Sequence, residues 1–98
     1  MIIKVERDGD TVTIFPEGRL DSMTAGEFER SVCENIDGAK TLVFDFLKLE
    51  YVSSAGLRVI LNAMKSMDKR GGLIVKNVNE FISELFEMTG FSEILTIE

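Results

Sequence analysis

Two adjacent serines, Ser53 and Ser54, are the side chains of this 98-residue sequence that are best placed to do chemistry. They lie in the stretch YVSSAGLRVIL, between an apolar run typical of a strand and an amphipathic run typical of a helix. A hydroxyl at the start of a helix can cap the helix, act as a nucleophile or carry a phosphate. Capping accounts for only one of the two hydroxyls.

Nucleophilic catalysis is the least supported of these three roles. The residues SSAG do not match the G-x-S-x-G pattern of serine hydrolases, and the chain contains no histidine to act as the base. Without histidine, and with Cys33 as the single cysteine, the sequence predicts no metal site. We therefore expect a binding protein without a cofactor, and not an enzyme, with Cys33 as a small buried apolar residue.

Composition limits the kinds of partner. Seventeen acidic residues against eleven basic ones give a net charge of −6, which argues against nucleic acid, because phosphate backbones need a basic face. No apolar run approaches the roughly eighteen residues of a membrane span, and the N-terminus has no signal-peptide pattern. A single cysteine fits a reducing compartment. We expect a cytoplasmic protein with a protein partner and no membrane contact.

The serines must be positioned by an α/β domain. Apolar runs of strand type alternate with amphipathic runs of helical spacing, which predicts one domain over residues 1–98. Its mixed sheet should have four or five strands, with a hairpin turn at Asp8-Gly9, packed against about three helices. The expected strands are 2–6, 11–15, 41–46, 71–76 and 92–97, and the expected helices are 24–36, 55–68 and 77–90.

Several local signals refine this expectation. Thr24 should cap the first helix, with Glu27 completing a capping box, and Asn77 should cap the third. Pro16 should lie near the end of the second strand. The nearly unbroken apolar run 41–46 predicts a central strand that is buried on both faces of the sheet.

Three stretches of the chain resemble the STAS domain of bacterial anti-sigma factor antagonists: GRLDSMTAGEFE, LVFDFLKLEYVSSAGLRVIL and FEMTGFSEIL. They occur in order over nearly the whole chain. The centre of the family pattern is an apolar strand, the motif D-S-S-G-L and an apolar helix. The resemblance implies a role in transcription regulation. In that family the protein binds an anti-sigma factor that is also a serine kinase, and thereby releases a sigma factor.

The resemblance also assigns roles to single residues. When Gly56 and Leu57 are aligned with the G-L of the motif, Ser54 falls on the serine that the kinase phosphorylates in the family, with Ser53 as second choice. Phosphorylation switches the antagonist off, and a phosphatase reverses it. Asp21 falls on the acidic residue of the family's G-x-L-D element, which lies near the phosphorylated serine.

The chain departs from the family pattern at three positions. Ser53 replaces the aspartate before the phosphorylated serine, which removes a negative charge that would repel a phosphate. Ala55 replaces the second serine of the motif. Arg58 stands where the family commonly has a small residue, and it follows Ser54 by one helical turn, close enough to pair with a phosphate.

Helical spacing predicts a docking surface beside the serines. Arg58 and Asn62 point outward, and Val59 and Ala63 lie beside the buried stripe, where they either contribute to the surface or are covered by neighbouring elements. The chain ends soon after its last expected strand, so we expect one face or edge of the sheet to be less covered. This leaves room for self-association, and we expect a monomer or a weak homodimer. The expected partner-binding residues are Asp21, Ser53, Ser54, Ala55, Gly56, Arg58, Val59, Asn62 and Ala63.

A second function remains open from the sequence. The same fold can serve as an unregulated scaffold or assembly module, in which Ser54 only caps the helix.

Overall fold

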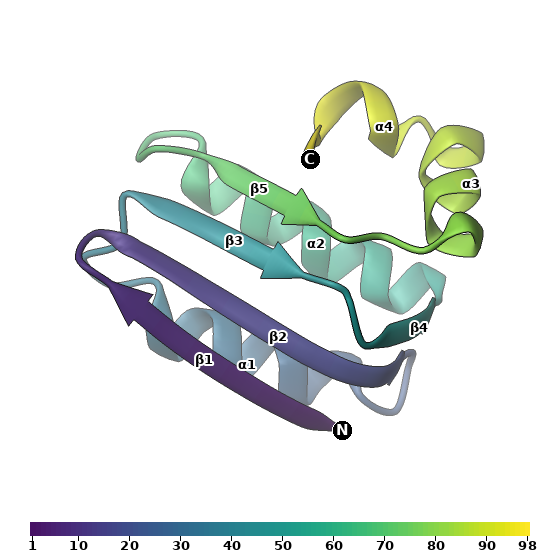
Figure 1. Cartoon of the computed structure of the whole chain (residues 1–98), viewed down its shortest axis with the longest axis horizontal. Helices are drawn as coiled ribbons and strands as arrows, with labels where there is room; N and C mark the ends of the chain where they lie inside the picture. Colours follow the sequence, from purple (N-terminus) through teal and green to yellow (C-terminus); the bar gives the residue numbers. More distant parts are fainter.

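The computed structural model describes residues 1–98 as an α/β fold with six strands and four helices (Figure 1). This confirms the α/β class and the mixed sheet, with more strands and one more helix than the sequence predicts. The strands are β1 (Ile2–Asp8), β2 (Thr11–Leu20), β3 (Thr41–Asp45), β4 (Leu49–Val52), β5 (Leu73–Lys76) and β6 (Thr96–Ile97). The helices are α1 (Ala25–Asn35), α2 (Ser54–Met67), α3 (Glu80–Thr89) and α4 (Phe91–Ile94). None of them is long and apolar enough to cross a membrane.

The sheet is organised around β2. Strands β1 and β2 form an antiparallel hairpin, and the remaining pairs are parallel, in the order β1-β2-β3-β5-β6. Strand β2 is ten residues long, so its first part, 11–14, pairs with β3 and its last part, 18–20, pairs with β4. The short strand β4 was not expected from the sequence, and it is the strand that leads into the two serines.

Pro16 lies inside β2 and not near its end. It falls in the interval where β2 pairs with neither β3 nor β4, and on the other side it faces Ile3 of β1. Proline has no backbone N–H to donate, so this interval is where a strand in the middle of a sheet tolerates it.

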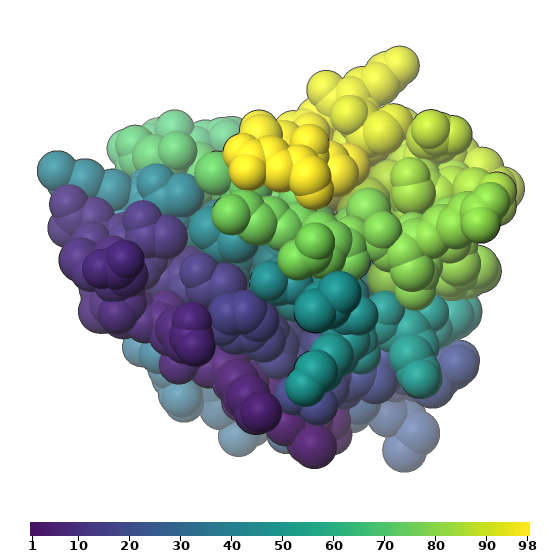
Figure 2. Space-filling view, in the orientation of Figure 1, coloured from purple at the N-terminus to yellow at the C-terminus, as the bar shows by residue number.

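Helices α1 and α2 lie on one face of the sheet, behind it in Figure 1, and no helix crosses the opposite face, which Figure 2 shows from the front. Between the sheet and these helices is an apolar core, in which the rings of Phe28 and Phe44 lie 5.0 Å apart. The prediction that β3 is a central strand buried on both faces is confirmed at Leu42, Val43 and Phe44, although no helix covers the open face. Val43 points to the open face and is nevertheless buried, because Thr13 and Ile74 flank it on the neighbouring strands.

Two of the predicted helix caps are replaced by other contacts. Thr24 is at the N-cap position of α1, but its hydroxyl makes no cap bond; it donates to the carbonyl of Arg19 instead, at 2.8 Å. Asn79, and not Asn77, caps α3, because its side chain accepts from the N–H of Ile82 at 2.8 Å. Asn77 has a positive φ of 59° and donates to Asp45.

Two further expectations need correction. The last segment is not one strand: Gly90, with a φ of 81°, ends α3, and the short helix α4 precedes the two-residue strand β6. Cys33 is exposed on α1 and is not a core residue, because the buried stripe of this helix consists of Ala25, Phe28 and Val32.

Candidate functional site

The two serines occupy different positions at the start of α2. Ser53 is the N-cap residue, with an extended backbone, and Ser54 is the first residue of the helix, so Ser54 is not the cap. The N–H of Ser53 donates to the carbonyl of Leu20 at 2.9 Å, and the carbonyl of Ser53 accepts from the N–H of Leu57 at 2.9 Å. The backbone at the serines is therefore fixed between the end of β2 and the first turn of α2.

The two hydroxyls also differ in their surroundings. The hydroxyl oxygen of Ser53 is buried and has no hydrogen-bond partner, and it does not cap the helix. Ser54 is exposed. Burial of an unpaired hydroxyl costs free energy, and it also removes that oxygen from the reach of a reagent or an enzyme. Of the two serines, Ser54 is therefore the one that is exposed to solvent.

Gly56 lets the first turn of α2 approach the sheet closely. A Cβ atom at this position would lie 2.8 Å from Cγ of Leu20, 2.9 Å from its carbonyl oxygen and 3.0 Å from Cγ1 of Val52. These distances are shorter than ordinary van der Waals contacts, and one of the atoms belongs to the backbone. The glycine is therefore a packing requirement that holds the serines against β2 and β4.

Asp21 follows β2 and lies beside the junction of β4 and α2 that carries Ser53 and Ser54, called the serine loop below. Leu20 and Val52 are paired in the sheet, so the residues that follow them leave from the same end of neighbouring strands. The carboxylate of Asp21 accepts from the N–H of Met23 at 3.0 Å and lies 3.8 Å from Nε of Arg19. The structure thus brings Asp21 to the end of the sheet from which α2 starts.

Helix α2 presents a polar line next to the serines. Ser54, Arg58 and Asn62 are exposed and follow one another by four residues, so they share one side of the helix. Ala55 is half-buried.

Val59 and Ala63 do not belong to this surface. Only 6% of Val59 and 4% of Ala63 is exposed, and both are part of the core. Gly56 is buried as well. Of the two alternatives open from the sequence for Val59 and Ala63, cover by neighbouring elements is the one observed. The predicted residues that keep exposed surface are Asp21, Ser53, Ser54, Ala55, Arg58 and Asn62, although the hydroxyl oxygen of Ser53 is buried.

A stack of side chains lies beside the serines and was not predicted from the sequence. The guanidinium of Arg19 lies 4.1 Å from the ring centroid of Tyr51, and the Tyr51 ring stacks on Phe81 with centroids 5.5 Å apart. Arg19 and Tyr51 face each other only because β2 pairs with β4. No local pattern signals this pairing, so the stack could not have been predicted.

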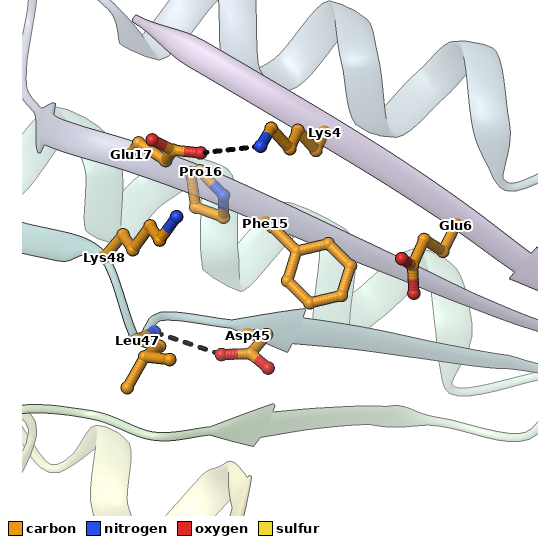
Figure 3. Close-up of a pocket in the computed structure, with 8 residues that line it drawn as sticks. All are labelled: Lys4, Glu6, Phe15, Pro16, Glu17, Asp45, Leu47 and Lys48. Carbon is orange, nitrogen blue, oxygen red and sulfur yellow. Dashed lines mark hydrogen bonds and ion pairs between the residues drawn. The ribbon is translucent and has the colours of Figure 1, made fainter.

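A shallow depression of about 260 Å³ lies elsewhere, on the open face of the sheet (Figure 3). Three of its charged groups are already paired with neighbours: Lys4 lies 3.8 Å from Glu17, and Asp45 accepts from the N–H of Leu47 at 3.1 Å. Its lining residues are Lys4, Glu6, Phe15, Pro16, Glu17, Asp45, Leu47 and Lys48. None of them is in the predicted set, so the chemistry at the serines does not depend on this depression.

Comparison with known proteins supports the assignment of the motifs. The sequence pattern of the STAS domain matches residues 2–98. The chain is 32% identical over 95 residues to the anti-sigma-B factor antagonist of Listeria monocytogenes, a match that covers 95% of this chain and 83% of the relative. The anti-sigma-B factor antagonist of Bacillus subtilis is 24% identical over 96 residues, which covers 97% of this chain and 88% of the relative.

Solved structures have the same fold. The anti-sigma factor antagonist SpoIIAA in its unphosphorylated form matches with a TM-score of 0.77 and 19% identity, covering 99% of this chain and 87% of that one. An anti-sigma factor antagonist from Mycobacterium paratuberculosis matches with a TM-score of 0.88 and 21% identity, covering 98% and 83%. At these identities the structures establish the fold alone. With residues 2–98 matched by the family pattern and a relative at 32% identity, the chain belongs to the STAS domain family.

Proposed function

We propose that this protein is an anti-sigma factor antagonist. It binds an anti-sigma factor that is also a serine kinase, releases the sigma factor and is switched off when that kinase phosphorylates Ser54. The names of the relatives support antagonism of an anti-sigma factor. The observation that carries the switch is the exposed hydroxyl of Ser54 in the first turn of α2, on a backbone fixed by β2.

Accessibility favours Ser54 over Ser53 as the phosphorylated residue. A kinase must bring the γ-phosphoryl group of ATP in line with the attacking hydroxyl oxygen, and a base must take up the proton of that hydroxyl. The Ser53 oxygen is buried and would need a local opening of the loop before transfer. The Ser54 hydroxyl needs none.

The surroundings of Ser54 suit both states of the switch. Ala55 is half-buried and projects little, so a partner can approach the backbone closely at this residue. The start of a helix carries unpaired N–H groups and about half a positive charge, and Arg58 lies one turn further on, so a phosphate on Ser54 is held without unfolding of the helix. The phosphate adds about −1.5 to −2 charges, bulk and a desolvation cost to the interface with the partner.

The expected partner surface follows from exposure. It comprises the serine loop with Ala55, the polar line of Ser54, Arg58 and Asn62 on α2, and the carboxylate of Asp21 in the adjacent loop. The charged groups of Asp21 and Arg58 suit the polar rim of a protein interface. A phosphatase that removes the phosphate restores binding.

The second function is an unregulated scaffold of the same fold, and Ser53 favours it. The family has an acidic residue at this position, whereas here a serine with a buried oxygen precedes the modified residue. A kinase that requires the acidic residue would not modify this chain. The scaffold therefore predicts that no serine takes up phosphate from any anti-sigma kinase.

Phosphate transfer distinguishes the two functions. The purified chain is mixed with ATP and the anti-sigma kinase candidates of the same genome, and the modified residue is located by mass spectrometry. We expect one phosphate on the chain, and none on Ser54→Ala. Ser66→Ala, which alters an exposed serine further along α2, is the matched control and should be modified normally. Modification that persists in Ser54→Ala and disappears in Ser53→Ala would move the site by one residue.

A further inference from the structure

Strand β1 forms a long open edge of the sheet. It is the first strand in the sheet order and pairs only with β2, so no strand lies beyond it in Figure 1. All of its seven residues except the half-buried Ile3 are exposed. An unpaired edge strand of this length offers a row of free N–H and C=O groups to another strand.

Pro16 identifies which groups of β1 are free. In an antiparallel pair, hydrogen-bonded residue pairs alternate with non-hydrogen-bonded ones. Ile3 faces Pro16, which has no N–H to donate, so this pair is a non-hydrogen-bonded one. By alternation the backbone N–H and C=O groups of Ile3, Val5 and Arg7 point away from β2, toward the open edge, while those of Lys4 and Glu6 bond to β2.

The edge strand is held in place before any partner binds. The guanidinium of Arg7 donates to the carbonyls of Asn35 and Asp37 at 3.0 Å and 2.9 Å, which ties β1 to the end of α1 and the loop that follows it. At the other end, the amino group of Met1 lies 3.5 Å from the carboxylate of Glu27. Because β1 is already extended and anchored, pairing with another strand orders few additional residues.

The charges on β1 are complementary to those of a second copy. Lys4 and Glu6 lie on either side of Val5 and on the same face of the sheet (Figure 3). When two β1 strands run antiparallel about a two-fold axis at Val5, each Lys4 faces Glu6 of the other copy. If the axis moves by one residue, Lys4 faces Lys4 of the second copy or Glu6 faces Glu6 of the second copy, which puts like charges together.

We propose that two copies of this chain associate through their β1 strands, antiparallel about a two-fold axis at Val5, and join their sheets into one. Val5 bonds with Val5 of the second copy, and Ile3 bonds with Arg7 of the second copy in both directions. These are the residues whose backbone groups are free, so the register that pairs the charges also satisfies the hydrogen bonds. Strand β4 and the serine loop lie on the other side of β2, so each copy keeps its Ser54 surface, and the pairing is independent of the proposed switch.

Sedimentation equilibrium tests the association, and a charge swap tests the register. We expect a concentration-dependent dimer, and at least a tenfold weaker association for Lys4→Glu and for Glu6→Lys, because each change creates two like-charge pairs in the symmetric dimer. The double variant with both changes should return to within about threefold of the unaltered chain. Lys69→Glu, an equal charge change at an exposed residue beyond α2, should have no effect.

Backbone contacts are tested by Val5→Pro and by hydrogen exchange. Val5→Pro removes an N–H that points away from β2, so the hairpin should persist and the chain should sediment as a monomer. With rising concentration of the unaltered chain, the amide of Val5 should exchange more slowly, while those of Lys4 and Glu6 stay equally protected. The proposal is overturned if the chain remains a monomer at millimolar concentration, or if a dimer forms that neither the charge reversals nor Val5→Pro weakens.

Discussion

Ser53 and Ser54 are neighbours in the chain, but α2 begins between them. The helix start leaves the Ser53 hydroxyl buried and unpaired and turns the Ser54 hydroxyl to the solvent. The sequence predicts both as candidates, and the resemblance prefers Ser54. It does not determine which one is accessible, because a shift of the helix start by a single residue exchanges their surroundings. That start is set by contacts with Leu20, which is far away in the sequence.

Because neither serine hydroxyl caps α2, removal of either should cost little stability. We expect Ser54→Ala to change the free energy of unfolding by less than about 0.5 kcal/mol, as for most surface substitutions. Ser53→Ala should be neutral or stabilising, because it removes a buried hydroxyl without a partner. Urea unfolding of the three proteins measures both effects. A loss of about 1 kcal/mol or more in Ser54→Ala would show that its hydroxyl caps the helix after all.

Gly56 should be far less tolerant of substitution than the serines. In Gly56→Ala the added Cβ meets the carbonyl oxygen of Leu20 at 2.9 Å, so we expect a loss of about 1–3 kcal/mol. Gly26→Ala is the matched control, because Gly26 is also in a helix and a Cβ there meets no atom within 4 Å. It should stabilise the fold by about 0.4–1 kcal/mol. Equal stabilities of the two variants in thermal unfolding would contradict the close packing of α2 on the sheet.

The elements were predictable where their signals are local. Apolar residues at helical spacing indicate α1, α2 and α3, and alternation with a turn at Gly9 indicates the first hairpin. Strand β4 could not be predicted, because its four residues are a strand only through pairing with the far end of β2. The choice between Asn77 and Asn79 as the cap of α3 is also nonlocal, because Asn77 is held by Asp45.

The polar line of α2, which consists of Ser54, Arg58 and Asn62, should contribute to partner binding. Arg58→Glu should weaken binding to the anti-sigma kinase at least tenfold, because it reverses a charge in the expected interface, with little change in the free energy of unfolding since Arg58 is exposed. Lys69→Glu makes the same charge change beyond the helix and should bind normally. Isothermal titration calorimetry measures the affinities. Unaltered affinity in Arg58→Glu would place the interface elsewhere.

Ala63 should behave in the opposite way to Arg58. Only 4% of it is exposed, so Ala63→Leu adds volume to the core and should cost about 1–3 kcal/mol of unfolding free energy. Any loss of binding in this variant would follow from the loss of folded protein. A variant that stays fully stable and yet fails to bind would return Ala63 to the partner surface.

The whole molecule presents two separate surfaces. Helices cover one face of the sheet, the serine loop and α2 form the proposed partner surface, and the edge of β1 lies on the other side of β2 (Figure 1). The α/β class and the family motifs were visible in the sequence. The open face was not, because the apolar run of β3 predicts burial on both faces of the strand but not which elements cover each face. Val43 is buried between Thr13 and Ile74 without a helix above it.

The affinity of the partner kinase for the phosphorylated and unphosphorylated chain tests the central claim most directly. Calorimetric titration should show at least a hundredfold loss of affinity on phosphorylation of Ser54, which corresponds to about 2.7 kcal/mol. Ser54→Asp and Ser54→Glu should lose less, because they carry less charge, and Ser54→Ala should bind like the unmodified chain. Circular dichroism of the phosphorylated chain should show an intact fold. Equal affinities for the two forms would contradict the switch, even if Ser54 is found to be phosphorylated.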